Sequence, residues 1–238
     1  MRRASLALAA ALSGCGFSTT PTPPDQGPAA GVKVVHAMPD APPVVVRIGR
    51  DTLAVGLSFI GLAYDEQYTR VQVGEQPIVL STTTAPVGTV VAGSQNFIRN
   101  GLYTIVATGR VAGNPSTGLV IVRDDELPLG PGQGGFRVLH AATGAAPELD
   151  TYVAVRGQVY AATPSIPATR FLGAGSVLLA AGQYAFCAVP AGVRPANDEG
   201  NCVVRGSLLV AQNTLTTAVV RDPRPPETVF GIIPVVSP

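Results

Sequence analysis

The chain has 238 residues with 16 basic and 15 acidic side chains, so its formal net charge is only +1. This balance lacks the basic excess of nucleic-acid-binding proteins and of polybasic membrane-surface proteins. Hydrophobic residues make up 46% of the chain and charged residues 13%, which excludes a highly charged disordered protein and predicts a folded core. We expect no nucleic-acid partner and no cofactor.

The first 14 residues predict an export signal. Arg2 and Arg3 precede an apolar run, Ala4–Leu12, and the small residues Ser13 and Gly14 follow it. Charge, apolar segment and small residues in this order are typical of a signal peptide, and the run is too short to span a bilayer. We expect residues 1–14 to be removed.

Cys15 is the predicted site of lipid attachment. Leu12–Cys15 resembles the lipobox of bacterial lipoproteins, which implies that the Cys15 thiol carries a diacylglycerol with palmitate-like chains. Two or three acyl chains anchor a protein firmly. Gly16 is not Asp, a pattern that resembles lipoproteins sent to the outer membrane, where the protein would face the periplasm or the cell surface. The alternative is an ordinary secreted protein that is cut nearby, in which Cys15 has no role.

Residues 15–31 predict a flexible tether behind this anchor. The segment is rich in proline, threonine and glycine and shows neither helical nor strand periodicity. Its prolines favour extended conformations that would hold the folded part away from the bilayer.

The rest of the chain contains two related copies. Val32–Pro42 recurs 104 residues later as Phe136–Pro147, and each copy has a basic residue, two aliphatic residues, His and Ala before a turn. Leu102–Ala107 corresponds to Leu215–Val220, where the spacing has grown to 113. We attribute the growth to an insert between Cys187 and Cys202.

Both copies consist of short runs rich in Val, Ile, Leu, Thr and Tyr, separated by Gly, Pro, Asn and Asp. About seven strands in roughly 100 residues predict an all-β protein with two tandem antiparallel, immunoglobulin-like β-sandwiches. The predicted units are residues 32–127 and 136–238, joined by a Gly/Pro-rich linker at 128–135.

Val32–Pro42 and Gly101–Ala107 resemble the domain-of-unknown-function 4397 family of bacterial proteins. The resemblance is good over residues 32–125 and weaker over 136–235, where Thr143–Ala145 replaces a Pro-Asp-Ala sequence. Members are often tandem, exported and sometimes lipid-anchored. The family has no established activity, so the resemblance implies fold and location only.

Cys187 and Cys202 are predicted to form a disulfide. Export would place them in an oxidising compartment, and their flanks read as strands on either side of a turn-rich insert. A metal pair or a redox dithiol is the alternative, but the spacing is not Cys-x-x-Cys.

His36 and His140 occupy equivalent places in the two copies. The first interpretation is a structural histidine at the rim of each core. The second joins His36 to Asp40 as a metal or acid–base pair, which the second copy lacks because it has no counterpart of Asp40.

Other motifs carry little chemistry. There is no Gly-x-Ser-x-Gly sequence, and Gly130–Gly135 precedes a strand where a dinucleotide site would follow one. The acidic runs Asp124–Glu126 and Asn197–Glu199 lack the spacing of a calcium loop and are predicted to be solvated turns.

The sequence therefore favours a lipid-anchored envelope protein that acts as a non-enzymatic binding, adhesion or scaffolding module. Its partner would be an envelope or surface protein or a polysaccharide. The alternative is a metal-dependent or hydrolytic envelope enzyme that uses His36 and Asp40.

Overall fold

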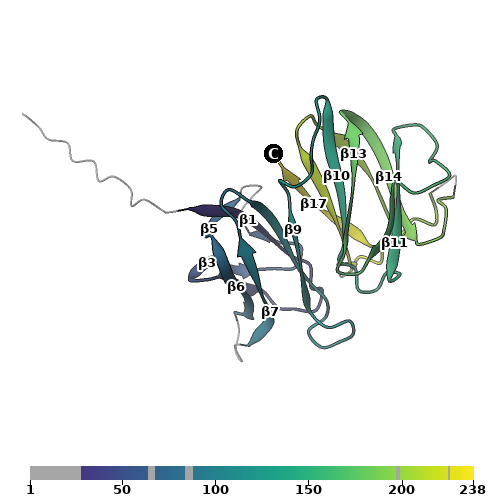
Figure 1. The fold of residues 1–238 in the computed structure, drawn as a ribbon. Helices are drawn as coiled ribbons and strands as arrows, with labels where there is room; N and C mark the ends of the chain where they lie inside the picture. The colour runs from purple at the N-terminus through teal and green to yellow at the C-terminus, as the bar shows by residue number, and fades with distance from the viewer. Residues whose placement is uncertain (1–27, 64–67, 84–87, 197–198, 225) are drawn as a thin grey trace, which may run out of the picture.

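A computed structural model describes residues 28–63, 68–83, 88–196, 199–224 and 226–238 (Figure 1). The predicted signal peptide, Cys15 and the tether up to Gly27 lie outside the described residues, as do residues 197 and 198 of the second acidic run. Across the described ranges the chain forms only strands, turns and loops, and none of it is a helix long and apolar enough to cross a membrane.

The strands divide into two sandwich units. The first unit contains β1 (Ala29–His36), β2 (Val44–Ile48), β3 (Asp51–Leu57), β4 (Leu62–Ala63), β5 (Thr69–Gln72), β6 (Gly74–Thr82), β7 (Thr89–Phe97), β8 (Leu102–Thr108) and β9 (Gly118–Arg123). The second contains β10 (Gln133–His140), β11 (Glu148–Val155), β12 (Ile166–Arg170), β13 (Ala174–Ala180), β14 (Gly182–Pro190), β15 (Val204–Val210), β16 (Leu215–Arg221) and β17 (Gly231–Ser237).

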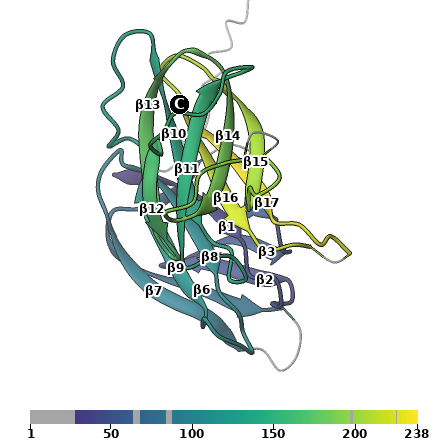
Figure 2. The same cartoon turned by 90° about the vertical axis from the view of Figure 1, so that its right-hand side faces the viewer.

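Each unit pairs two sheets in the same order. In the first, β4, β1, β8 and β9 form one sheet, with β5 also beside β1, and β3, β2, β6 and β7 form the other. In the second, the sheets run β13-β10-β16-β17 and β12-β11-β14-β15. The two units therefore have the same topology, with β13 in the place of β4 and β5, which confirms the predicted pair of all-β sandwiches (Figures 1 and 2).

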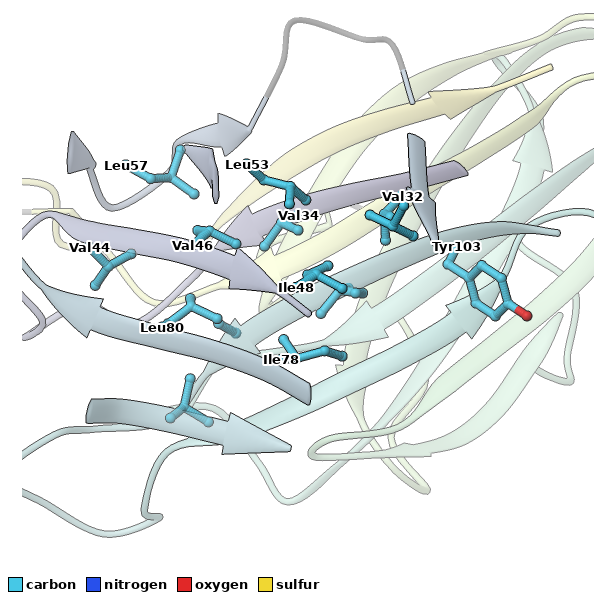
Figure 3. Packing of buried hydrophobic residues seen from close by; sticks show 14 of the residues in the cluster. Val32, Val34, Val44, Val46, Ile48, Leu53, Leu57, Ile78, Leu80 and Tyr103 are labelled. Carbon is cyan, nitrogen blue, oxygen red and sulfur yellow. The ribbon is translucent and has the colours of Figure 1, made fainter. Parts of the chain in front are cut away.

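Alternating side chains of the facing sheets form each core. In the first unit, Val44, Val46 and Ile48 of β2 point inward while Arg47 is exposed. These residues pack against Ile78 and Leu80 and against β1 and β8 (Figure 3). The period of two in the sequence thus places one face of each strand in the core.

The sequence predicted antiparallel sheets, but each unit contains one parallel pair of strands. β1 runs parallel to β8, with His36 opposite Ala107, and β10 runs parallel to β16, with His140 opposite Val220. A parallel pair requires a long crossover, and here the intervening strands supply it, most of which belong to the other sheet of the unit. The predicted correspondence between β8 and β16 is confirmed, because Leu102 and Leu215 pair with the equivalent residues Gly31 and Gly135.

Two predicted flexible segments end earlier than expected. Ala29–Gly31 belong to β1 and pair with β5, and residues 133–135 belong to β10. A side chain on Gly134 would collide with the Ala211 carbonyl oxygen, and one on Gly135 would collide with Leu127. These glycines permit close packing of a strand and are not part of a flexible linker.

Candidate functional site

His36 and His140 sit at the ends of β1 and β10, where they are completely buried. The Nε2 atom of His140 lies 2.7 Å from the Ala146 carbonyl oxygen, so it must donate the proton. The Nδ1 atom of His36 accepts a hydrogen bond from the Met38 amide at 3.2 Å. Each imidazole therefore supports the loop that follows its own strand.

Burial lowers the pKa of both histidines below 6.5, because desolvation disfavours the imidazolium form. The carbonyl groups of Pro42 and Ala146 oppose this shift without reversing it. Both rings are therefore neutral at pH 7. This matches the structural interpretation of the two histidines.

Asp40 is exposed in the loop between β1 and β2, and its carboxylate accepts hydrogen bonds from backbone amides. Its two oxygens accept hydrogen bonds from the amides of Val111 and Ala112, at 3.0 and 3.2 Å. Asp40 thus fastens this loop to the one after β8, and the structure gives His36 and Asp40 different partners.

The second unit makes the same connection in the opposite direction. Asp222 follows β16 and accepts hydrogen bonds from the Thr143 amide, the Thr143 hydroxyl and the Gly144 amide, at 2.7–2.9 Å. The loops joined are equivalent to those joined by Asp40. Within the described residues, no group of three or more His, Cys, Asp and Glu side chains is placed to hold a metal ion.

Cys187 and Cys202 form a disulfide, as predicted. Cys187 is completely buried on the outer face of β14, next to Tyr152 and Val189. On the same face the Tyr160 hydroxyl donates to Glu199 at 2.7 Å. The bond holds the insert after β14 against the sheet, which is a structural role.

The two units share an apolar interface. The outer faces of the β1 and β10 sheets meet in a single buried cluster, and Figure 1 shows β10 and β17 facing β1 and β9. Its fully buried members are Val35, Ala37, Val106, Val120, Leu139, Ala141, Val219, Ile233 and Val235. The apolar character of both faces of β1 and β10 therefore reflects a core on one side and the neighbouring unit on the other.

A buried ion pair joins the units at one end of this interface. Arg137 donates to Asp124 at 2.6 Å, and the side chains are 7% and 0% exposed. The other Asp124 oxygen accepts hydrogen bonds from the hydroxyl groups of Tyr68, Thr104 and Ser237. Burial next to this carboxylate raises the pKa of Tyr68. The prediction of a solvated turn at Asp124 is therefore wrong, because a partner from the second unit neutralises its charge.

The interface contacts follow an internal two-fold relationship. Lys33 and Arg137 are equivalent, since they lie opposite Thr104 and Thr217 in the parallel pairs. Lys33 Nζ donates to the carbonyl oxygen of Val236 on β17, and Arg137 donates to that of Arg123 on β9.

The strand registers make Arg123 and Val236 equivalent as well. Asp124 and Ser237, the next residues along, hydrogen-bond to each other. The units therefore associate as the subunits of a symmetric dimer do, through the same face of each.

A groove opens where this interface reaches the edge of the second unit. It has a volume of about 290 Å³ and is lined by Lys33, Ile60, Leu62 and residues 232–236. Apart from Lys33 these residues are aliphatic or proline. Ile60, Leu62, Ile233 and Val235 also belong to the apolar cluster between the units. The groove is thus an open continuation of the interface.

A family model described as a domain of unknown function, DUF4397, matches residues 30–152, more than half of the chain. The chain belongs to the DUF4397 family. The DUF4397 match starts in β1 and ends within β11, so it covers the first sandwich, β10 and part of β11. It includes Asp124 and Arg137 but not β17.

Other comparisons add no function to the DUF4397 assignment. No curated protein matches this chain in sequence. The Bacillus anthracis TIE protein has a TM-score of 0.27 and 10% identity over 81% of this chain, which spans only 34% of that protein. The family CBM26 module CBMbc of Eubacterium rectale Amy13K, solved with maltoheptaose, has a TM-score of 0.24 and 10% identity, with 84% of this chain and 95% of the module covered.

This DUF4397 chain has a second repeated motif, which was not predicted from the sequence. Phe59-Ile60-Gly61 and Phe171-Leu172-Gly173 lie beside the two histidines, and both central residues have positive φ, 70° and 63°. The rings of Phe59 and Phe171 stand edge-on to His36 and His140. A comparison of the two copies over their full length could have found the shared Phe-x-Gly sequence. It could not have predicted that Ile60 lines the groove.

Proposed function

We propose that this protein is a non-enzymatic binding module of the bacterial cell envelope. It is exported, carries its lipid on Cys15, and is held at the outer membrane with the two sandwiches facing the periplasm or the cell surface. The observation that supports a binding role is the apolar groove between the units, with its eight lining residues. Clefts between domains that are lined by apolar side chains are common ligand sites.

The rigid union of the two units supports the same proposal. An apolar cluster and the buried pair of Asp124 and Arg137 join them, so the groove has a fixed shape before a partner arrives. Preorganised surfaces bind with a smaller entropy cost than mobile ones.

The contacts of the candidate catalytic residues point away from an enzyme. His36 is buried and supports a loop, while Asp40 accepts hydrogen bonds from two backbone amides. Both have structural partners. The enzyme alternative predicts that purified protein holds a metal that the variant His36→Ala loses, whereas our proposal predicts equal metal content by elemental analysis.

Site-specific photo-cross-linking in living cells tests the binding role. A benzoylphenylalanine at Val236, which is 49% exposed in the groove, is compared with one at Val155, which is 55% exposed at the end of β11. We expect recurrent cross-linked products from position 236 only. Equal patterns at both positions, or none at either, would contradict a binding role for the groove.

The anchor is tested separately. Labelling with an alkyne analogue of palmitate should mark the protein, and Cys15→Ala should abolish both the label and membrane sedimentation. Protease treatment of intact and permeabilised cells then distinguishes a surface-facing from a periplasmic protein. Unchanged labelling of Cys15→Ala would overturn the lipid anchor while leaving the binding role to be judged on the cross-linking.

A further inference from the structure

The groove lies beside an edge of β17. Among the residues that the structure describes, this strand has a neighbour on one side only, in the order β13-β10-β16-β17. Its other side faces the groove, which residues 232–236 line. An unpaired strand edge offers backbone donors and acceptors that another extended chain can use.

The offset between the stacked sheets creates this arrangement. Lys33 of β1 contacts Val236 of β17, so β17 lies over β1, the second strand of its sheet. β4, the strand beside β1 that carries Leu62, therefore lies beyond the edge of β17. Leu62 and the adjoining Ile60 form an apolar floor next to the open edge.

The position of Pro234 shows which backbone groups point into the groove. Pro234 lies opposite Ala218 of β16, and because proline has no N–H, this must be a non-hydrogen-bonded pair. Outward-pointing groups recur at every second residue. The amides of Ile232 and Val236 and the carbonyl groups of Ile232 and Pro234 are thus directed at the groove.

The carbonyl oxygen of Val236 fits this assignment, because it accepts a hydrogen bond from Lys33 across the groove wall. Pro234 and Lys33 together restrict pairing, as prolines and lysines do at protected strand edges. They leave a short, defined set of donors and acceptors above an apolar floor.

We propose that the groove binds an extended segment of a partner polypeptide, which adds to β17 as a fifth strand of the β10 sheet and places alternate apolar side chains on Ile60 and Leu62. The proposal rests on the binding role proposed above and names its ligand class. Such strand addition takes affinity from backbone hydrogen bonds and specificity from alternate side chains. A polysaccharide lacks the peptide N–H and C=O groups that extend a β-ladder.

On the related side of the molecule, the corresponding apolar residue lies against the edge strand. By the internal symmetry, β13 extends past the edge of β9, and Leu172 corresponds to Ile60. Leu172 packs closely on Gly118 of β9, where an added Cβ would lie 3.2 Å from its side chain. We therefore expect one strand-binding edge at this interface, beside β17.

A displayed library of random seven-residue peptides, selected on the full mature chain, supplies the probe. We expect enriched sequences with apolar residues at alternate positions, and binding of a synthetic enriched peptide that is measured by fluorescence anisotropy. N-methylation of its β17-facing amides should weaken binding at least tenfold, while N-methylation of the alternate amides should change it little.

Protein variants complete the test. Val236→Pro removes one groove-facing amide and should weaken binding several-fold, whereas Val236→Ala keeps that amide and serves as its control. Leu62→Lys should weaken binding by placing a charge in the floor, with thermal melting to confirm folding.

Failure to enrich alternating peptides, or binding that is indifferent to N-methylation and to both Val236→Pro and Leu62→Lys, would overturn strand addition. Recurrent cross-links from position 236 to polysaccharide would then leave the binding role standing with a different ligand.

Discussion

Asp40 in the first sandwich and Asp222 in the second join the same pair of loops from opposite sides. Asp40 reaches from the loop after β1 to the amides of Val111 and Ala112, and Asp222 reaches from the end of β16 to those of Thr143 and Gly144. A residue that has no counterpart in the aligned copy thus has a functional equivalent in the structure. Asp40 therefore holds two loops together in the first unit, as Asp222 does in the second.

The two sandwiches also differ in what they contribute to their shared interface. The first supplies a carboxylate, Asp124, where the second has only the hydroxyl of Ser237. Arg137 compensates the charge of Asp124, whereas the equivalent Lys33 donates a hydrogen bond to the carbonyl oxygen of Val236. The two units thus share the geometry of the interface, while its charged groups are distributed unequally between them.

Asp124→Ala should have the largest effect of any substitution at this interface. It leaves the buried Arg137 unpaired, which typically costs about 3–5 kcal/mol. Ser237→Ala, at the equivalent position, removes hydrogen bonds to Asp124 and Tyr68 but leaves no charge unpaired, and it should cost about 1–2 kcal/mol. Urea unfolding of the two variants gives both values, and equal losses would refute the asymmetry.

Removal of the disulfide should have the next largest effect. The disulfide closes a loop of 15 residues. In the chain-entropy account, combining Cys187→Ala and Cys202→Ala therefore lowers the stability of the protein by about 3 kcal/mol. The first sandwich has no such bond among its described residues, so amide exchange should accelerate mainly in the second. Uniform acceleration in both would show that the units do not differ in this way.

Asp222→Asn should destabilise the protein more than Asp40→Asn. Asp222 is buried and accepts three hydrogen bonds, whereas Asp40 is exposed and accepts two. Hydrogen bonds to charged groups contribute about 1.5–3 kcal/mol when buried and less at an exposed site. Thermal unfolding should rank the variants in this order, and the reverse order would indicate another role for Asp40.

Acidification should produce the smallest effect and act on both units alike. The folded pKa of His36 and of His140 lies below the unfolded value of 6.5, so the unfolded chain binds more protons. Their contribution is fully present above pH 6.5 and is lost as the pH falls from there through the lower folded pKa. Urea unfolding at pH 7.5 and 5.5 should show this loss, and His36→Gln should reduce it by about half.

Much of the fold could be predicted from particular residues. The alternation in Val44–Ile48 indicated a half-buried strand, and the recurrence of the histidine segment indicated a duplicated sandwich. The parallel pairs could not be predicted, because period-two patterns carry no information on strand direction. The burial of Asp124 also escaped prediction, since Arg137 becomes its neighbour only when two sheets stack.

The site was less predictable than the fold. The groove combines Ile60 and Leu62 with residues 232–236, and only the offset of the stacked sheets brings these distant segments together. Pro234 could have indicated an edge strand, but the sequence does not reveal what such an edge faces.

Amide hydrogen exchange along β17 in the mature protein tests most directly whether the edge beside the groove is open. We expect fast exchange at Ile232 and Val236, whose amides point into the groove. We expect slow exchange at Ile233 and Val235, which pair with Val219 and Thr217 of β16. Equal protection at all four amides would show that the edge is already covered and would contradict strand addition.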